Sequence, residues 1–73
     1  MTDLGEYLQR KSANKAEIAR RTGISKARIT ELSNNETTRL TAKELYLIIL
    51  AVDDNPGEVF NKLFANIKLK VKA

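Results

Sequence analysis

Residues 14–35, NKAEIARRTGISKARITELSNN, predict two short helices joined by one tight turn. Asn14 and Glu17 have the spacing of a capping box at the start of the first helix. Gly23 can end that helix in a left-handed conformation, and Ser25 can cap the next helix two residues later. Helices this short do not persist alone in water, so the two must pack on each other and on the rest of the chain. The short link with a glycine at its corner is typical of a helix-turn-helix.

The hydrophobic pattern predicts three further helices around this unit. Apolar spacing and capping signals place the five helices at about residues 3–11, 15–22, 26–33, 42–52 and 56–65. Thr41 with Glu44, and Asn55 with Glu58, are expected to form capping boxes for the last two. Residues 45–52 are apolar nearly all round, which is typical of a central helix or of one that shares a face with a partner. The predicted fold class is all-α, a compact five-helix bundle.

The last part of the chain has a different pattern. Residues 1–66 make one domain, and residues 67–73, IKLKVKA, then alternate apolar and basic residues with the period of a strand. A short strand, a flexible basic arm and a frayed terminus all fit this pattern. We expect a short C-terminal strand or basic arm that supports a dimer.

The composition excludes several classes of protein. The 73 residues carry a net charge of +4 and contain neither cysteine nor histidine. The chain therefore lacks the thiols of a disulfide framework and the commonest general base, and it has no nucleophile–base pair, metal-ligand cluster or phosphate-binding glycine loop. We expect no enzymatic activity, cofactor, metal site or small-molecule ligand. No apolar run has the length of a membrane span and no signal peptide opens the chain, so we expect a cytoplasmic protein.

The positive charge is concentrated in two parts of the chain. Residues 14–43 contain seven basic and three acidic residues, and residues 67–73 contain three lysines and no acidic residue. Residues 44–66 contain one basic residue and four acidic ones. Because nucleic-acid-binding proteins commonly gather their cations on one face, this division favours nucleic acid as the partner of the two-helix unit.

The second helix of the pair has an unusual outer face. Ile29 and Leu32 share one direction on a helical wheel, which must face the core. The opposite direction has short side chains or an acid at its centre and cations on its flanks: Ala27, Thr30 and Glu31 at the centre, Lys26 and Arg28 on the flanks. Such a face suits the major groove, because short residues let base edges approach and the cations can reach guanine or phosphate. A solvated helix face is the alternative.

Arg28 is the exception in a pattern that the other helices share. It occupies the third position after the cap, where Glu17, Glu44 and Glu58 stand in three of the other helices. A cation in the first turn opposes the helix dipole, at a cost of about 0.3–1 kcal/mol, whereas a carboxylate there would repel phosphate. We interpret this exception as a mark of the helix that contacts DNA.

Polar residues at the ends of the two helices are candidates for contact with the DNA backbone. They are Asn14, Lys15, Ser25, Asn34, Asn35 and Arg39. Asn14 can cap its helix while the exposed amides beside it hold a phosphate. For Asn35 a left-handed helix cap is the alternative. Arg20 and Arg21 are expected to be solvated or ion-paired.

The stretch KAEIARRTGISKARITELSN at residues 15–34 resembles the helix-turn-helix of the phage Cro/C1 repressor (Xre-type) family. The resemblance covers about residues 3–64, and its most specific elements lie at the motif spacing: Ala19, Gly23, Ile29 and Leu32. It implies a lambda repressor-like domain with its third helix in the major groove, usually dimeric on a near-palindromic operator. It also implies contacts by position, to bases from Lys26, Ala27 and Glu31 with Arg28 at the edge of that surface, and to phosphates from Asn14, Lys15 and Asn34.

The chain departs from the family pattern in two places. Lys15 stands where many members have glutamine, and residues 33–35 read Ser-Asn-Asn where many have Glu-Asn-Gly. The first departure weakens any inference about base orientation, and the second adds a side chain that can contact DNA.

The sequence therefore predicts a double-stranded DNA-binding transcriptional regulator, a repressor that binds a near-palindromic operator as a homodimer. Activation is equally compatible with the sequence. We expect it to be bacterial or phage-encoded and nucleoid-associated. The alternative is a protein-interaction module or antitoxin-like adaptor that uses residues 42–65.

Overall fold

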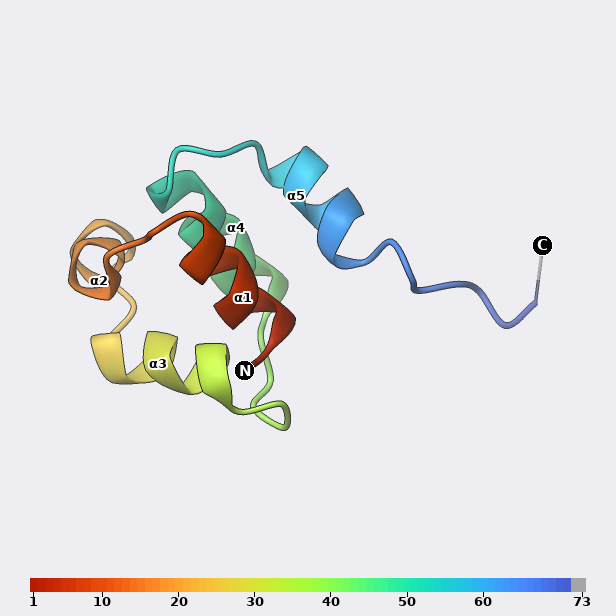
Figure 1. Cartoon of the computed structure of the whole chain (residues 1–73), viewed down its shortest axis with the longest axis horizontal. Coiled ribbons are helices and arrows are strands. Elements are labelled where there is room, and N and C mark those ends of the chain that lie inside the picture. The colour runs from red at the N-terminus through yellow and green to blue at the C-terminus, as the bar shows by residue number, and fades with distance from the viewer. Residues whose placement is uncertain (72–73) are drawn as a thin grey trace.

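Five helices follow one another along the chain in the computed structural model, which describes residues 1–71 (Figure 1). They are α1 (Asp3–Arg10), α2 (Lys15–Thr22), α3 (Lys26–Asn34), α4 (Ala42–Ala51) and α5 (Pro56–Leu63). All five predicted helices are present, with ends within two residues of those expected, and the all-α fold class is confirmed. Within the described residues, no helix is long and apolar enough to cross a membrane.

Each helix begins at a polar residue whose side chain accepts a hydrogen bond from the first turn. These caps are Thr2, Asn14, Ser25, Thr41 and Asn55. Only Thr41 and Glu44 form the reciprocal capping box. The reciprocal boxes predicted for α2 and α5 are wrong: the Glu17 carboxylate pairs with Arg20 one turn later, and the Glu58 carboxylate accepts no hydrogen bond from residues 1–71. A nearby guanidinium therefore outcompetes the cap amide in α2.

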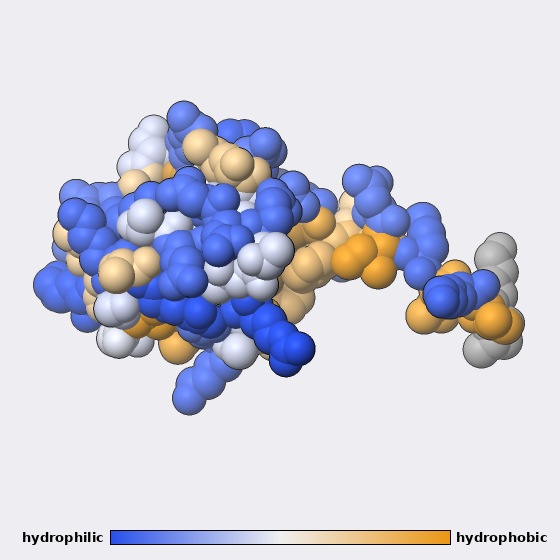
Figure 2. All heavy atoms as spheres, turned by 90° about the horizontal axis from the view of Figure 1, so that it is seen from below, coloured by the Kyte–Doolittle hydropathy of each residue, from blue (hydrophilic) through white to orange (hydrophobic). Residues whose placement is uncertain are grey.

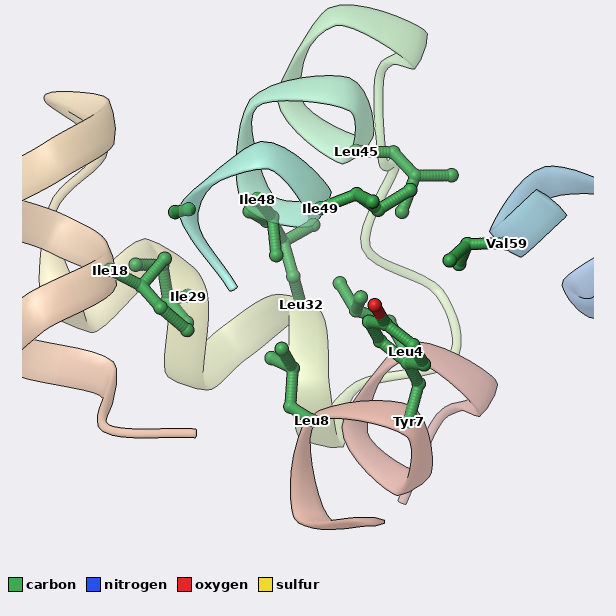
Figure 3. Close-up of a cluster of buried hydrophobic side chains, with 11 residues drawn as sticks. Leu4, Tyr7, Leu8, Ile18, Ile29, Leu32, Leu45, Ile48, Ile49 and Val59 are labelled. Carbon is green, nitrogen blue, oxygen red and sulfur yellow. The ribbon is translucent and has the colours of Figure 1, made fainter. Parts of the chain in front are cut away.

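The core is one apolar cluster to which all five helices contribute (Figure 3). It consists of Leu4, Tyr7, Leu8, Ile18, Ile29, Leu32, Leu45, Ile48, Ile49, Ala51 and Val59. α1 and α2 pack on α3, and α4 packs on both α2 and α5. α5 ends at Leu63, and Phe64, which follows it, is 43% exposed.

α1 approaches the last turn of α3 very closely. The Thr2 amide donates to the Ser33 carbonyl at 2.9 Å, and the Thr2 hydroxyl donates to the Leu32 carbonyl at 2.8 Å. Gly5 makes this approach possible, since a Cβ atom there would lie 2.2 Å from the Ser33 carbonyl oxygen. These contacts fix the end of α3 against the body.

Asp54 ties the segment after α4 to α1. Its carboxylate accepts from the Tyr7 hydroxyl at 2.7 Å and forms an ion pair with Lys11 at 3.1 Å. The Tyr7 hydrogen bond, assisted by the Asn55 amide and Lys11, lowers the pKa of Asp54 from 3.8 to about 2. Burial and the same hydrogen bond raise the pKa of Tyr7.

Residues 67–71 extend away from the helices and form no strand (Figure 1). The alternation that predicts a strand finds no partner here, because a strand needs a neighbouring backbone edge and none lies beside this segment. Of the strand or basic arm predicted over residues 67–73, the strand is therefore absent from residues 67–71, whereas the arm stays a prediction. The last two residues of this segment lie outside the described part of the chain.

Replacing Gly5 with alanine is expected to destabilise the fold, although alanine favours helix over glycine. The new Cβ would push α1 from α3, and overpacking of this kind costs about 1–3 kcal/mol. Urea unfolding followed by circular dichroism measures the change. Gly57→Ala in α5 is the control, since its Cβ would meet only the Asn55 Oδ1 atom at 3.3 Å. Equal effects of the two variants would contradict the close approach.

Replacing Asp54 with asparagine is expected to lower the free energy of unfolding at neutral pH. It should also make that free energy depend less steeply on pH in the acid range. Because folding lowers the pKa of Asp54, its contribution is present above about pH 4 and is lost as the pH falls through about 2. Urea midpoints at pH 7, 4, 3 and 2 report the loss. Asp53→Asn is the control: it removes a neighbouring carboxylate that is 80% exposed and lies 3.5 Å from Arg21, and asparagine tolerates the left-handed backbone there, where φ is 59°. An acid decline that is unchanged in Asp54→Asn would rule out this role.

Candidate nucleic-acid interface

The turn between α2 and α3 has the predicted geometry. Gly23 ends α2 with φ at 79°, and its amide donates to the Ala19 carbonyl at 3.0 Å. Ser25 then caps α3 by accepting from the Arg28 amide at 3.1 Å. Ile24 is half-buried between them and packs against the core. The two helices are thus connected by a turn that is fixed at both ends.

The face of α3 that points away from the core is polar. Ile29 and Leu32 are buried, so the opposite side of the helix faces solvent. Exposed on it are Lys26, Ala27 and Glu31, and Thr30 is half-buried beside them. Figure 2 shows that the side of the molecule that carries α3 is largely hydrophilic. Solvent can therefore reach all three of these residues, which are predicted to contact bases from the centre and one flank of the helix.

Arg28 is not the free flanking cation that the wheel predicts. Its guanidinium forms a fork with the Glu44 carboxylate of α4, through Nε to Oε2 at 3.0 Å and Nη2 to Oε1 at 3.1 Å. Nη2 also donates to the Arg39 carbonyl at 2.7 Å. The arginine that opposes the dipole of α3 is therefore compensated by a carboxylate from another helix.

Glu44 has two functions in the fold. Besides holding Arg28, its Oε1 atom accepts from the Thr41 amide at 3.1 Å and from the Thr41 hydroxyl at 3.0 Å. The Arg28 pair, followed by the Thr41 amide, lowers the pKa of Glu44 from 4.5 to about 2. The sequence gives no signal for the pair with Arg28, because the capping box alone accounts for a glutamate at this position.

Lys15 and Asn34 lie at the same hollow although 19 positions separate them. This hollow has a volume of about 450 Å³ and lies between α1, the start of α2 and the end of α3. Met1, Gln9 and Ser12 line it as well. The sequence does not predict that Gln9 and Ser12 lie near the end of α3, because no local pattern around these residues points to that helix. Two of the residues predicted to contact phosphate are thus brought together.

The remaining candidates lie at the ends of α2 and α3. Asn14 and Ser25 are exposed, and each uses its side-chain oxygen as a cap. Asn35 has φ at −109°, so a left-handed cap is wrong; its Oδ1 accepts instead from the Thr37 amide and hydroxyl. Arg39 is exposed, and only its carbonyl is tied to Arg28.

Arg20 and Arg21 are ion-paired, as expected. Arg20 pairs with Glu17 on α2. Arg21 donates to the Ala51 carbonyl at 2.8 Å and lies 3.5 Å from Asp53, so it ties α2 to the end of α4. Neither side chain belongs to the outer face of α3.

Comparison with known proteins identifies the family. The family described as Cro/C1-type HTH DNA-binding domain matches residues 3–61 of the 73, a range that includes all of α1–α4 and most of α5. No significant match was found among curated proteins or among solved structures. No group of acidic residues within residues 1–71 is arranged to hold a metal ion. The helix-turn-helix geometry and the family match agree, and the chain belongs to the Cro/C1-type HTH DNA-binding domains.

Proposed function

We propose that this DNA-binding domain is a transcriptional repressor that occupies a near-palindromic operator as a homodimer, with α3 in the major groove. The observation that carries the proposal is the uncovered outer face of α3 with Lys26, Ala27 and Glu31 exposed on it. A helix must present unshielded side chains to read base edges, and short ones allow it to approach closely. Occupying a promoter is the simplest way in which such a domain regulates transcription.

The polar residues of α3 suit different bases. Lys26 can donate to the acceptors of guanine, whereas Glu31 can accept from the amino group of cytosine. The Thr38 hydroxyl lies 3.4 Å from Glu31 Oε1, close enough to restrain the direction of that carboxylate. Ala27 leaves room for a thymine methyl group or for close approach of the groove floor. These three residues are our candidates for sequence readout.

The residues around α3 are suited to hold the DNA backbone. Lys15 and Asn34 line one hollow beside the two helices. Arg39 and Asn35 are exposed in the loop after α3, and Asn14 and Ser25 stand at the helix starts. Contacts to phosphates carry no sequence information, but they set the register of the reading helix on the duplex.

A second, apolar surface lies on α4, α5 and the segment that follows. Its exposed members are Tyr46, Leu50, Phe64, Ile67, Leu69 and Val71, with exposures from 43% to 79%. Phe60 and Phe64 meet edge to face at 5.7 Å, and a hollow of about 420 Å³ lies between Tyr46, Pro56 and Phe60. Figure 2 shows apolar residues gathered on α5 and the following segment. Large apolar side chains exposed in this number on neighbouring parts of the chain are typical of a protein–protein interface.

We propose that a second copy of the chain covers this apolar surface. A two-fold axis would pair the surface with itself and close the assembly as a dimer. The charges also fit, because Glu58 of α5 has no ion-pair partner within residues 1–71 and neither Lys68 nor Lys70 has one there. Lysines of one copy can therefore lie near Glu58 of the other while the apolar side chains meet.

Selection from a random duplex pool is expected to yield two inverted half-sites whose centres lie about one turn, roughly 34–36 Å, apart. Glu31→Ala should relax preference at one base position by about 1–3 kcal/mol. Lys15→Ala should weaken binding to all duplexes alike and reduce the slope of log affinity against log salt by about 0.9. Fluorescence anisotropy at several salt concentrations measures both. Absence of binding to any duplex at low salt would contradict the proposal and favour the adaptor alternative.

Replacing Leu50 with lysine is expected to convert the dimer to a monomer, because it puts a charge in the apolar interface. Sedimentation equilibrium gives the association state, and circular dichroism checks that the fold is kept. Lys43→Glu on the N-terminal part of α4 is a control outside the surface. Deletion of residues 67–73 tests the part of the interface that follows α5. A dimer that survives both changes would place the contact elsewhere.

A further inference from the structure

The pair between Arg28 and Glu44 joins the reading helix to α4. Arg28 lies in the first turn of α3, and Glu44 lies in the first turn of α4, after the loop that follows α3. About one third of the Arg28 side chain and one fifth of the Glu44 side chain are exposed, so the pair lies at the edge of the body, within reach of solvent. A bound duplex could compete for the guanidinium at this position.

The donors of Arg28 are mostly occupied by this pair. A guanidinium has five N–H groups in a planar fork, and two parallel donors are needed for bidentate contact with guanine O6 and N7. Nε and Nη2 serve Glu44, and the second N–H of Nη2 serves the Arg39 carbonyl. Only Nη1 makes no hydrogen bond within residues 1–71. Two donor pairs could make a bidentate contact, Nε with Nη2 and Nη1 with Nη2. Both pairs include Nη2, so neither is free.

Glu44 is held firmly enough to keep Arg28 in place. Its carboxylate takes two bonds from Thr41 in addition to the two from Arg28, so its own position is fixed by the capping box. Its lowered pKa keeps it ionised throughout the neutral range. The carboxylate also cancels the charge of Arg28, which reduces the attraction of that side chain to phosphates.

We propose that Glu44 is a specificity-determining positioning residue, which holds Arg28 out of the set of side chains that read bases. The proposal rests on the proposed DNA-binding function of α3 and assigns base reading to Lys26, Ala27 and Glu31 without Arg28. It follows that Arg28, although it lies in the first turn of α3, does not contribute to the base preference of the parent protein. Loss of the carboxylate would add that arginine to the readout.

The test compares half-sites selected from a random duplex pool by full-length variants. Glu44→Gln retains an oxygen for the Thr41 cap but loses the charge that holds Arg28. It is expected to gain a preference of about tenfold for guanine at one further position. Between 50 and 200 mM salt, its affinity for DNA should also fall about 3.5-fold more than that of the parent, as expected when one more cationic side chain contacts the DNA. Arg28→Gln should keep the half-site of the parent.

Two further variants separate this role from a merely structural one. Glu44→Gln combined with Arg28→Gln should return to the half-site and salt slope of the parent, since the gain depends on Arg28. Glu6→Gln removes an exposed carboxylate from the first turn of α1, which has no ion-pair partner within residues 1–71, and should leave the half-site unchanged. Thermal unfolding followed by circular dichroism establishes that each variant is folded.

The outcomes distinguish this inference from the function on which it rests. A parent half-site that loses a base position in Arg28→Gln overturns the inference alone, because Arg28 would then read that base. A folded Glu44→Gln variant with the half-site and salt slope of the parent overturns it as well. A parent protein that selects no duplex overturns the DNA-reading function, and the inference with it.

Discussion

The orientation of α3 depends on the burial of Ile29 and Leu32 in the core that all five helices share. Gly5 lets α1 approach the last turn of the same helix, so that Thr2 bonds to carbonyls there. Because cores are close-packed and hydrogen bonds are directional, these contacts restrict both rotation and tilt of the helix. The outward direction of Lys26, Ala27 and Glu31 thus follows from what the opposite side buries.

Ion pairs reduce the free charge of the two-helix unit below what its composition suggests. Of the seven basic residues in positions 14–43, three have carboxylate partners: Arg20, Arg21 and Arg28. Within residues 1–71 the other four have none, and three of them lie close to α3 or the loop that follows it: Lys15, Lys26 and Arg39. The charge available for DNA is therefore concentrated on a few side chains at the edges of α3.

The apolar and polar surfaces of this small protein lie on different elements. α3 presents the polar face, whereas the large exposed apolar side chains within residues 1–71, apart from Met1, belong to α4 and residues 64–71. α4 connects the two, since Ile48 and Ile49 are buried in the core while Tyr46 and Leu50 face outward. This separation would let one copy bind DNA and a second copy at the same time without competition between the two surfaces.

Sequence by itself determined the number of helices, their caps and the turn at Gly23, because these depend on local spacing and on backbone preferences within a few residues. It also identified which side of α3 faces inward. Only the tertiary structure decided the partner of Arg28, since Glu44 is 16 residues away and has a local explanation as a cap. The same holds for the hollow shared by Lys15 and Asn34 and for the lack of a strand in residues 67–71. These features depend on which residues far apart in sequence lie close together in the fold, and the periodicity of the sequence does not indicate that.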